Sequence, residues 1–129
     1  MATRAMAAAS VLALAGCSDF LNMCRNDVLA DVHSPSGERH AVVFQRDCGA
    51  TTGFGVQVSI LRRGKALPNE AGNTFTADAN HDAGVSLDVQ PIWESDRVLR
   101  LTHDDRLRTF TRERSVAGVE IVYQPSPAR

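Results

Sequence analysis

Several short segments of the chain alternate hydrophobic and polar residues, which is the pattern of β-strands with one buried face. Two segments show it most clearly, at residues 56–60 and 85–89. Further strand-like runs of apolar residues cover residues 28–32, 40–45, 89–93, 98–102 and 119–123. Turn residues fall between these runs, apart from Pro91, which indicates an edge strand or a bulge. The pattern therefore predicts an all-β domain.

This domain is expected to be a small antiparallel sandwich or barrel of about seven or eight strands, because short strands recur with turns between them. A signal helix precedes it, and no later segment shows a helical period. The predicted core contains the inward-facing apolar residues of the runs, namely Val28, Val43, Val56, Val58, Ile60, Val85, Leu87, Val89, Trp93, Leu99, Leu101, Val119 and Ile121.

The N-terminal segment has the features of an export signal. Arg4 supplies a positive charge, and residues 5–15 are apolar apart from one serine. The sequence Leu14-Ala15-Gly16-Cys17 that follows resembles the lipobox of bacterial lipoprotein precursors. The resemblance implies cleavage before Cys17 and lipid attachment to it, which would anchor the protein to a membrane. The alternatives are an ordinary secretory signal with a chance cysteine, or a buried N-terminal helix.

Lipid attachment also implies a cellular location and a division of the chain into four parts. In that family an Asp directly after the cysteine favours the inner membrane, and here Ser18 follows Cys17. We therefore expect the periplasmic face of the outer membrane, with the inner membrane or another bacterial cell membrane as the alternative. The predicted parts are a signal peptide (1–16), a lipidated tether (17–23), a single β domain (24–124) and a C-terminal tail (125–129).

The chain has three cysteines, and an odd number in an exported protein needs an explanation. If Cys17 carries lipid, Cys24 and Cys48 remain as a pair in an oxidising compartment. A hairpin folded at residues 34–37 pairs residues whose numbers sum to about 71 or 72, which places these two cysteines opposite each other. A disulfide is therefore predicted. The alternative is a metal or redox thiol site, although the spacing is not C-x-x-C.

The segment Cys48-Gly49-Ala50-Thr51-Thr52-Gly53 is the most distinctive in the chain. A similar segment occurs in a family of small bacterial proteins without an assigned activity, many of them lipoproteins. Trp93, Asp96 and the run Leu99-Arg100-Leu101 resemble the closing hairpin of the same family. The resemblance covers about residues 24–123, and it implies a lipoprotein without implying a reaction.

Composition and motifs narrow the function classes. The formal net charge is −1, which argues against nucleic acid as a partner. No apolar run reaches the roughly 18 residues of a transmembrane helix. Neither G-x-S-x-G nor H-E-x-x-H occurs, so a protein that is not an enzyme and holds no cofactor is expected.

A stripe of arginines is the main candidate for ligand binding. The residues Arg106, Arg108, Arg112 and Arg114 share parity with Phe110, so on one extended strand they would project from one face. Such a face would bind an anionic envelope ligand, such as lipopolysaccharide or a glycan. The alternative is a solvated edge strand whose charges prevent aggregation.

Other candidate sites have weaker support. The Gly/Thr-rich loop at residues 49–55 is either an anion cradle or a crossover loop beside the disulfide. His81-Asp82 and His103-Asp104-Asp105 place imidazoles beside carboxylates, but without metal-ligand spacing, so exposed loops and no metal are expected. His33 and His40 flank the first turn and show no metal pattern either.

The sequence thus favours a membrane-anchored, non-catalytic module that binds a protein partner or acts as an accessory protein. Binding of an anionic envelope ligand through the arginines is the alternative. A cryptic hydrolase is a third class, and it requires His81 or His103 to meet a carboxylate in a cleft.

Overall fold

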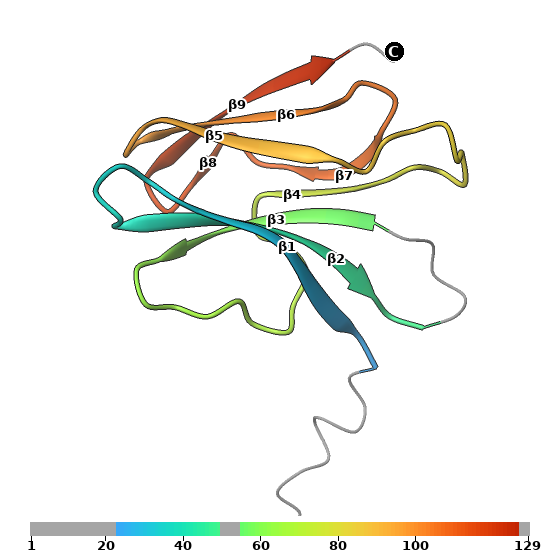
Figure 1. The fold of residues 1–129 in the computed structure, drawn as a ribbon, viewed down its shortest axis with the longest axis horizontal. Helices are drawn as coiled ribbons and strands as arrows, with labels where there is room; N and C mark the ends of the chain where they lie inside the picture. Colours follow the sequence, from blue (N-terminus) through green and yellow to red (C-terminus); the bar gives the residue numbers. More distant parts are fainter. Residues whose placement is uncertain (1–22, 50–54, 127–129) are drawn as a thin grey trace, which may run out of the picture.

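The computed structural model describes residues 23–49 and 55–126, and these form two stacked β-sheets (Figure 1). The larger sheet has the strand order β1-β2-β3-β4-β7, and the smaller one has the order β5-β6-β9-β8. The strands are β1 (Arg25–His33), β2 (Arg39–Asp47), β3 (Gly55–Arg62), β4 (Phe75–Asp78), β5 (Val89–Ser95), β6 (Val98–Asp104), β7 (Arg108–Arg112), β8 (Ser115–Val116) and β9 (Val119–Ser126).

The all-β prediction is confirmed, with nine strands among the described residues. Neighbouring strands are antiparallel except β6 and β9, which run parallel because the chain passes through β7 in the other sheet between them. β9 ends at Ser126, later than the predicted run at residues 119–123. Within the described ranges, no helix is long and apolar enough to span a membrane. The predicted signal helix lies outside these ranges.

The first hairpin confirms the predicted turn and contains an unexpected bulge. Near the turn, β1 and β2 pair residues whose numbers sum to 73, as His33 and His40 do. A register shift at Leu29 changes the sum to 72, so Arg25 lies opposite Asp47. Without this bulge Cys24 would lie opposite Gly49. The bulge therefore brings Cys24 into line with Cys48.

The hydrophobic core lies between the two sheets and contains most of the predicted residues. Ten of them are buried: Val43, Val56, Val58, Ile60, Val85, Val89, Leu99, Leu101, Val119 and Ile121. Leu87 and Trp93 are partly buried and pack against this core. Val28 is 56% exposed, so its assignment to the core was wrong. The bulge at Leu29 explains the error, because it turns Val28 to the outer face, opposite Phe44, while Ala30 faces the core.

Residues 85–88 are loop, so the strand predicted over 85–89 was wrong apart from Val89, where β5 begins. Aspartate side chains hold the residues just before this segment in turns: Asp78 accepts a hydrogen bond from the Asn80 backbone, and Asp82 accepts one from the Gly84 backbone. Such local bonds compete with strand pairing. Val85 is still buried in the core, so the alternation marked buried positions but not a strand.

β2 is buried on both faces. Ala41 and Val43 face the core between the sheets, whereas Val42 and Phe44 lie on the outer face and are 2% and 0% exposed. The β3–β4 connection, residues 63–74, covers that outer face and runs below the larger sheet in Figure 1. Its Gly72 amide donates to the Gln57 side chain, which lies opposite Phe44 on β3. The larger sheet therefore packs a second, smaller apolar layer.

Tyr123 on β9 connects the two sheets. Its hydroxyl donates to the Glu113 carbonyl oxygen at 2.6 Å, and the Thr74 carbonyl oxygen lies 3.3 Å away. The Arg112 guanidinium stacks on its ring at 4.3 Å. Burial raises the pKa of Tyr123 to about 12, against the effect of the nearby Arg112 charge.

We expect the Tyr123 phenol to ionise at about pH 12 in the folded protein and at about pH 10 in the unfolded chain. Because the folded-state pKa is the higher one, the stability it contributes is complete below pH 10 and is lost between pH 10 and 12. Tyr123 is the only tyrosine, so absorbance at 295 nm reports it alone. Ionisation near pH 10 with the fold intact would contradict its burial.

Candidate functional site

The Cys24–Cys48 disulfide is formed at the open end of the first hairpin, with the two Cα atoms 3.8 Å apart. Polar side chains fix the β3–β4 connection beside it. Asn69 donates to the Cys24 carbonyl oxygen, and Asn26 donates to the carbonyl oxygens of Pro68 and Glu70. The predicted pairing is therefore confirmed, and the disulfide end is tied to the covering connection.

Two predicted sites cannot be placed. Cys17, the predicted lipid attachment residue, lies outside the described residues, and so do residues 50–54 of the Gly/Thr-rich loop. At the edges of this loop, the Gly49 amide donates to the Asp47 carboxylate, and Gly55 begins β3. Lipid attachment and anion binding by the loop stay predictions.

The arginine stripe does not share one face. Register shifts between Thr76 and Ala77 on β4, so Arg108 lies opposite Asp78 while Arg112 lies opposite Phe75. Residues three apart on β4 face opposite sides of the sheet, and the two arginines therefore do so as well. The prediction of a single basic face was wrong because a bulge in β7 reverses the alternation.

Acidic partners occupy two of the four arginines. Arg108 binds both carboxylate oxygens of Asp78, at 3.0 and 2.6 Å, which lowers the pKa of that carboxyl. Arg106 binds both carboxylate oxygens of Asp104 and lowers its pKa in the same way. Arg112 stacks on Tyr123, and Arg114 is exposed. Anion binding by this surface stays a prediction, and carboxylates already pair with two of its four arginines.

The two histidine–aspartate segments differ in their surroundings. His81 is in an exposed loop, as predicted. His103 is buried, which corrects the prediction of an exposed loop. Its Nδ1 lies 2.8 Å from the Asp104 carbonyl oxygen, its ring packs on Phe75 and Tyr123, and its Nε2 has no partner among the described residues. His103 is therefore a core side chain.

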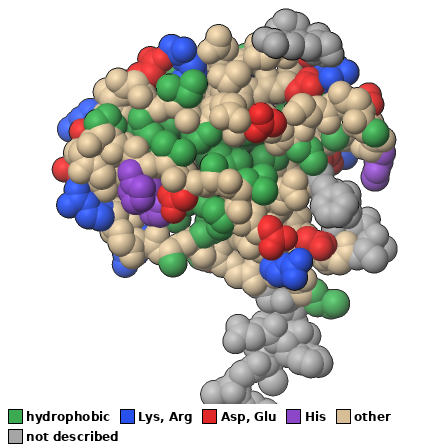
Figure 2. All heavy atoms as spheres, viewed as in Figure 1, with side chains coloured by type: hydrophobic (Ala, Val, Ile, Leu, Met, Phe, Trp, Pro, Cys, Tyr) green, Lys and Arg blue, Asp and Glu red, His purple; other side chains and the backbone are tan. Residues whose placement is uncertain are grey.

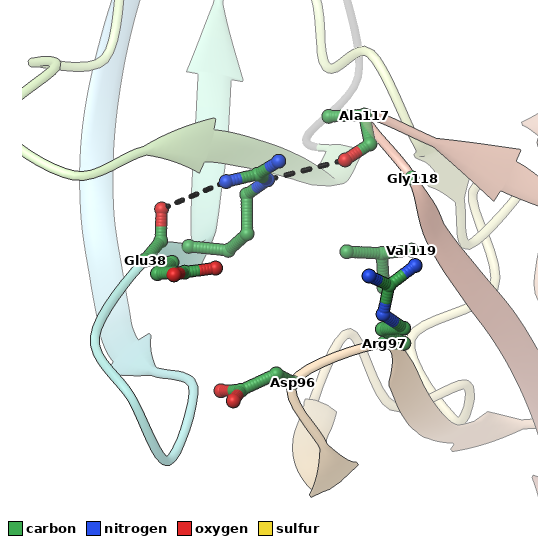
Figure 3. Close-up of a pocket in the computed structure, with 7 residues that line it drawn as sticks. Glu38, Asp96, Arg97, Ala117, Gly118 and Val119 are labelled. Carbon is green, nitrogen blue, oxygen red and sulfur yellow. Dashed lines mark hydrogen bonds between the residues drawn. The ribbon is translucent and has the colours of Figure 1, made fainter.

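A polar cavity of about 240 Å³ lies where three turns meet (Figure 3). Arg39 extends across it and donates to the carbonyl oxygens of Ala117 and Glu38. Asp96 faces the cavity, and hydrogen bonds from Ser36 hold the pKa of its carboxyl below its usual range. The cavity is smaller than the roughly 300–1,000 Å³ of typical ligand pockets. It fits a turn junction better than a substrate site.

The clearest candidate surface is the open edge of the sandwich, where β1 and β5 lie next to each other (Figure 1). Figure 2 shows hydrophobic side chains in a band across the middle of this face. On β1, Leu29 is 54% exposed; on β5, Ile92 is 49% exposed and alternates with the inward-facing Pro91 and Trp93. Trp93 links the two edges, because its Nε1 donates to the Val32 carbonyl oxygen at 2.8 Å.

Sequence reasoning missed the β1 side of this edge, because the bulge at Leu29 has no sequence signature. The edge position of β5 was signalled by Pro91, and the sheet order confirms it. Sequence reasoning also missed a cluster of Asp31, His33 and His40, which the β1–β2 hairpin brings together. The signal was available, since the predicted turn places His33 near His40, and Asp31 shares a face with His33. Comparison of the chain with protein-family models, curated proteins and solved structures gives no match.

Proposed function

We propose that this chain is a lipid-anchored protein of a bacterial envelope that binds a protein partner along β1 and β5. The observation that carries the proposal is the apolar surface on these two adjoining edge strands. An edge strand presents unpaired backbone N–H and C=O groups, which pair with an extended segment of another protein. The partner we propose therefore supplies such a strand, with apolar side chains that cover Leu29 and Trp93.

The cysteine arrangement supports the proposed location. The formed Cys24–Cys48 disulfide is typical of an exported protein, and it leaves Cys17 as the odd cysteine that the lipobox resemblance assigns to lipid. Cys17 and Cys24 are only seven positions apart in the chain. Even fully extended, this segment spans about 25 Å, so the disulfide end of the domain stays close to the membrane. The proposed membrane is the outer one, on its periplasmic face.

The arginine alternative has less support from the side-chain geometry. Asp78 and Asp104 pair with two of the four arginines, and Arg112 lies on the opposite face of β7 from Arg108. Neither a cleft that joins His81 with His103 nor a nucleophile–base pair is seen in the described ranges. A non-catalytic role therefore remains the proposal.

We expect a photo-crosslinking residue at Leu29 to capture one dominant protein in the cells that make this chain. A matched probe at Phe110 serves as the control, because Phe110 is also apolar and 65% exposed but lies on β7, the other edge of the same sheet. Mass spectrometry identifies the adducts. Cys17→Ser in the same cells should release the protein from the membrane fraction.

Three results would contradict parts of the proposal. Capture from Phe110 but not from Leu29 would place the partner elsewhere. Adducts with lipid or glycan alone, weakened by salt, would favour the arginine alternative. Membrane retention of the Cys17→Ser protein would mean that another anchor exists.

A further inference from the structure

The first hairpin brings an aspartate and two histidines together on the outer face of the larger sheet. His33 on β1 lies directly opposite His40 on β2, and Asp31 precedes His33 by two residues on the same face. The two imidazole rings stack with their centroids 5.0 Å apart. One ligand atom from each of the three side chains lies within 4.8 Å of the others.

The hydrogen bonds of His40 fix which of its nitrogens is available. Its Nε2 lies 3.0 Å from the Lys65 carbonyl oxygen, which accepts hydrogen bonds and cannot donate them. Nε2 therefore carries a proton, and the second nitrogen, Nδ1, is directed at Asp31. A histidine that ligates a metal commonly donates its other N–H to a backbone carbonyl in this way. His40 is 6% exposed, so this orientation is held by its surroundings.

The contact between His40 and Asp31 needs a cation to hold it. Nδ1 lies 2.6 Å from the Asp31 carboxylate oxygen, and both atoms have lone pairs. A proton between them satisfies both atoms, as does a metal ion that takes the proton's place. The second arrangement releases one proton to solvent and leaves the Lys65 hydrogen bond unchanged.

We propose that Asp31, His33 and His40 form a Zn²⁺ site, with a water molecule as the fourth ligand. Two imidazoles and one carboxylate suit zinc, whereas calcium and magnesium prefer oxygen ligands alone. Ligands about 2.1 Å from a tetrahedral ion lie about 3.4 Å apart. The Asp31 oxygen must therefore move away from His40 Nδ1, which is now 2.6 Å from it, to admit the ion, while all three donors already lie within 4.8 Å of one another. The Asp31 side chain is 44% exposed and His33 is exposed, so both can rotate relative to the buried His40.

The proposed zinc site is independent of the proposed protein partner. Zinc would bind β1 to β2 at the turn end, while the disulfide binds the same two strands at the other end. The edge strand β1 would then be fixed at both ends. The class of ligand is a divalent transition metal, and Zn²⁺ is the probe.

The test is a Zn²⁺ titration of the full chain in detergent, followed by calorimetry and thermal unfolding. All proteins carry Cys17→Ser, so that no free thiol competes for the metal. We expect one Zn²⁺ per chain and a melting temperature raised by about 10 °C at a hundredfold excess over Kd. His33→Asn should weaken binding by about tenfold or more, since it removes a ligand on an exposed side chain.

His81→Asn is the matched control, because His81 is an exposed histidine in a loop far along the chain. It should bind Zn²⁺ as the parent does. The proposal fails if the parent binds no zinc, if His33→Asn binds as tightly as the parent, or if His81→Asn weakens binding equally. Because His33 is exposed, His33→Asn should fold as the parent does. Thermal unfolding of this variant without zinc checks that a loss of binding is not a loss of folding.

Discussion

Reduction of the Cys24–Cys48 disulfide lowers the free energy of unfolding by about 3–4 kcal/mol, the value expected for closing a loop of this length in the unfolded chain. The two cysteines are 24 residues apart in sequence. A small domain has a total stability of only about 5–15 kcal/mol, so this loss is a large fraction of it. The measurement is urea unfolding of the Cys17→Ser protein with and without a reducing agent.

The double variant Cys24→Ser, Cys48→Ser should match the reduced protein. At room temperature both should keep the folded hairpin, because Asn69 and Asn26 still bind the β3–β4 connection to β1. The reducing agent should not affect the double variant, which separates loss of the disulfide from a side effect of the agent. Equal stability of the oxidised and reduced parent proteins would show that the disulfide contributes nothing to the fold.

The disulfide shows how far local sequence reasoning reaches. A turn signal at residues 34–37 fixes the hairpin, and counting outward from it pairs Cys24 with Cys48 to within one residue. The last residue is set by the bulge at Leu29, which depends on how β1 packs against its neighbours. The pairing was therefore predictable, whereas the exposure of Val28, which results from the same bulge, was not.

Alternating residues identify burial more reliably than they identify strands. Residues 56–60 and 85–89 alternate equally well, and both supply residues to the core. Only the first is a strand. The second follows Asp78, Asn80 and Asp82, whose side chains or backbones form turns that end strand pairing. The aspartates before residues 85–89 were the sequence signal for a loop, and the alternation of apolar residues pointed the other way.

Candidate sites were less predictable than the fold, because they depend on contacts between distant residues. The arginine stripe was inferred from sequence parity, which holds only for an unbroken strand. A bulge reverses the parity, and Asp78, 30 residues before Arg108, supplies a partner that spacing does not reveal. The three residues of the proposed zinc site were close in sequence, but the orientation of His40 comes from Lys65 on a different connection.

Phe44 and Phe75 were the largest omissions from the predicted core, and Phe44 lies on the outer face of the larger sheet. The run at residues 40–45 was expected to bury alternate residues, yet β2 buries Ala41, Val42, Val43 and Phe44 in succession. Such a run occurs when a strand is covered on both faces. The sequence did not show that the β3–β4 connection, with its glycine, proline and asparagine residues, folds back over the sheet to form that cover.

Phe44→Ala should destabilise the protein by about 3–5 kcal/mol, because truncating a fully buried aromatic side chain leaves a cavity beneath the connection. Val28→Ala is the matched control. Val28 lies directly opposite Phe44 on the same face but is 56% exposed, so its loss should cost about 0.5 kcal/mol or less. Urea unfolding of both variants measures the difference. If Val28→Ala cost as much stability as Phe44→Ala, Val28 would have to be buried. The bulge at Leu29 would then be absent, and the outer layer around Phe44 would not be a second core.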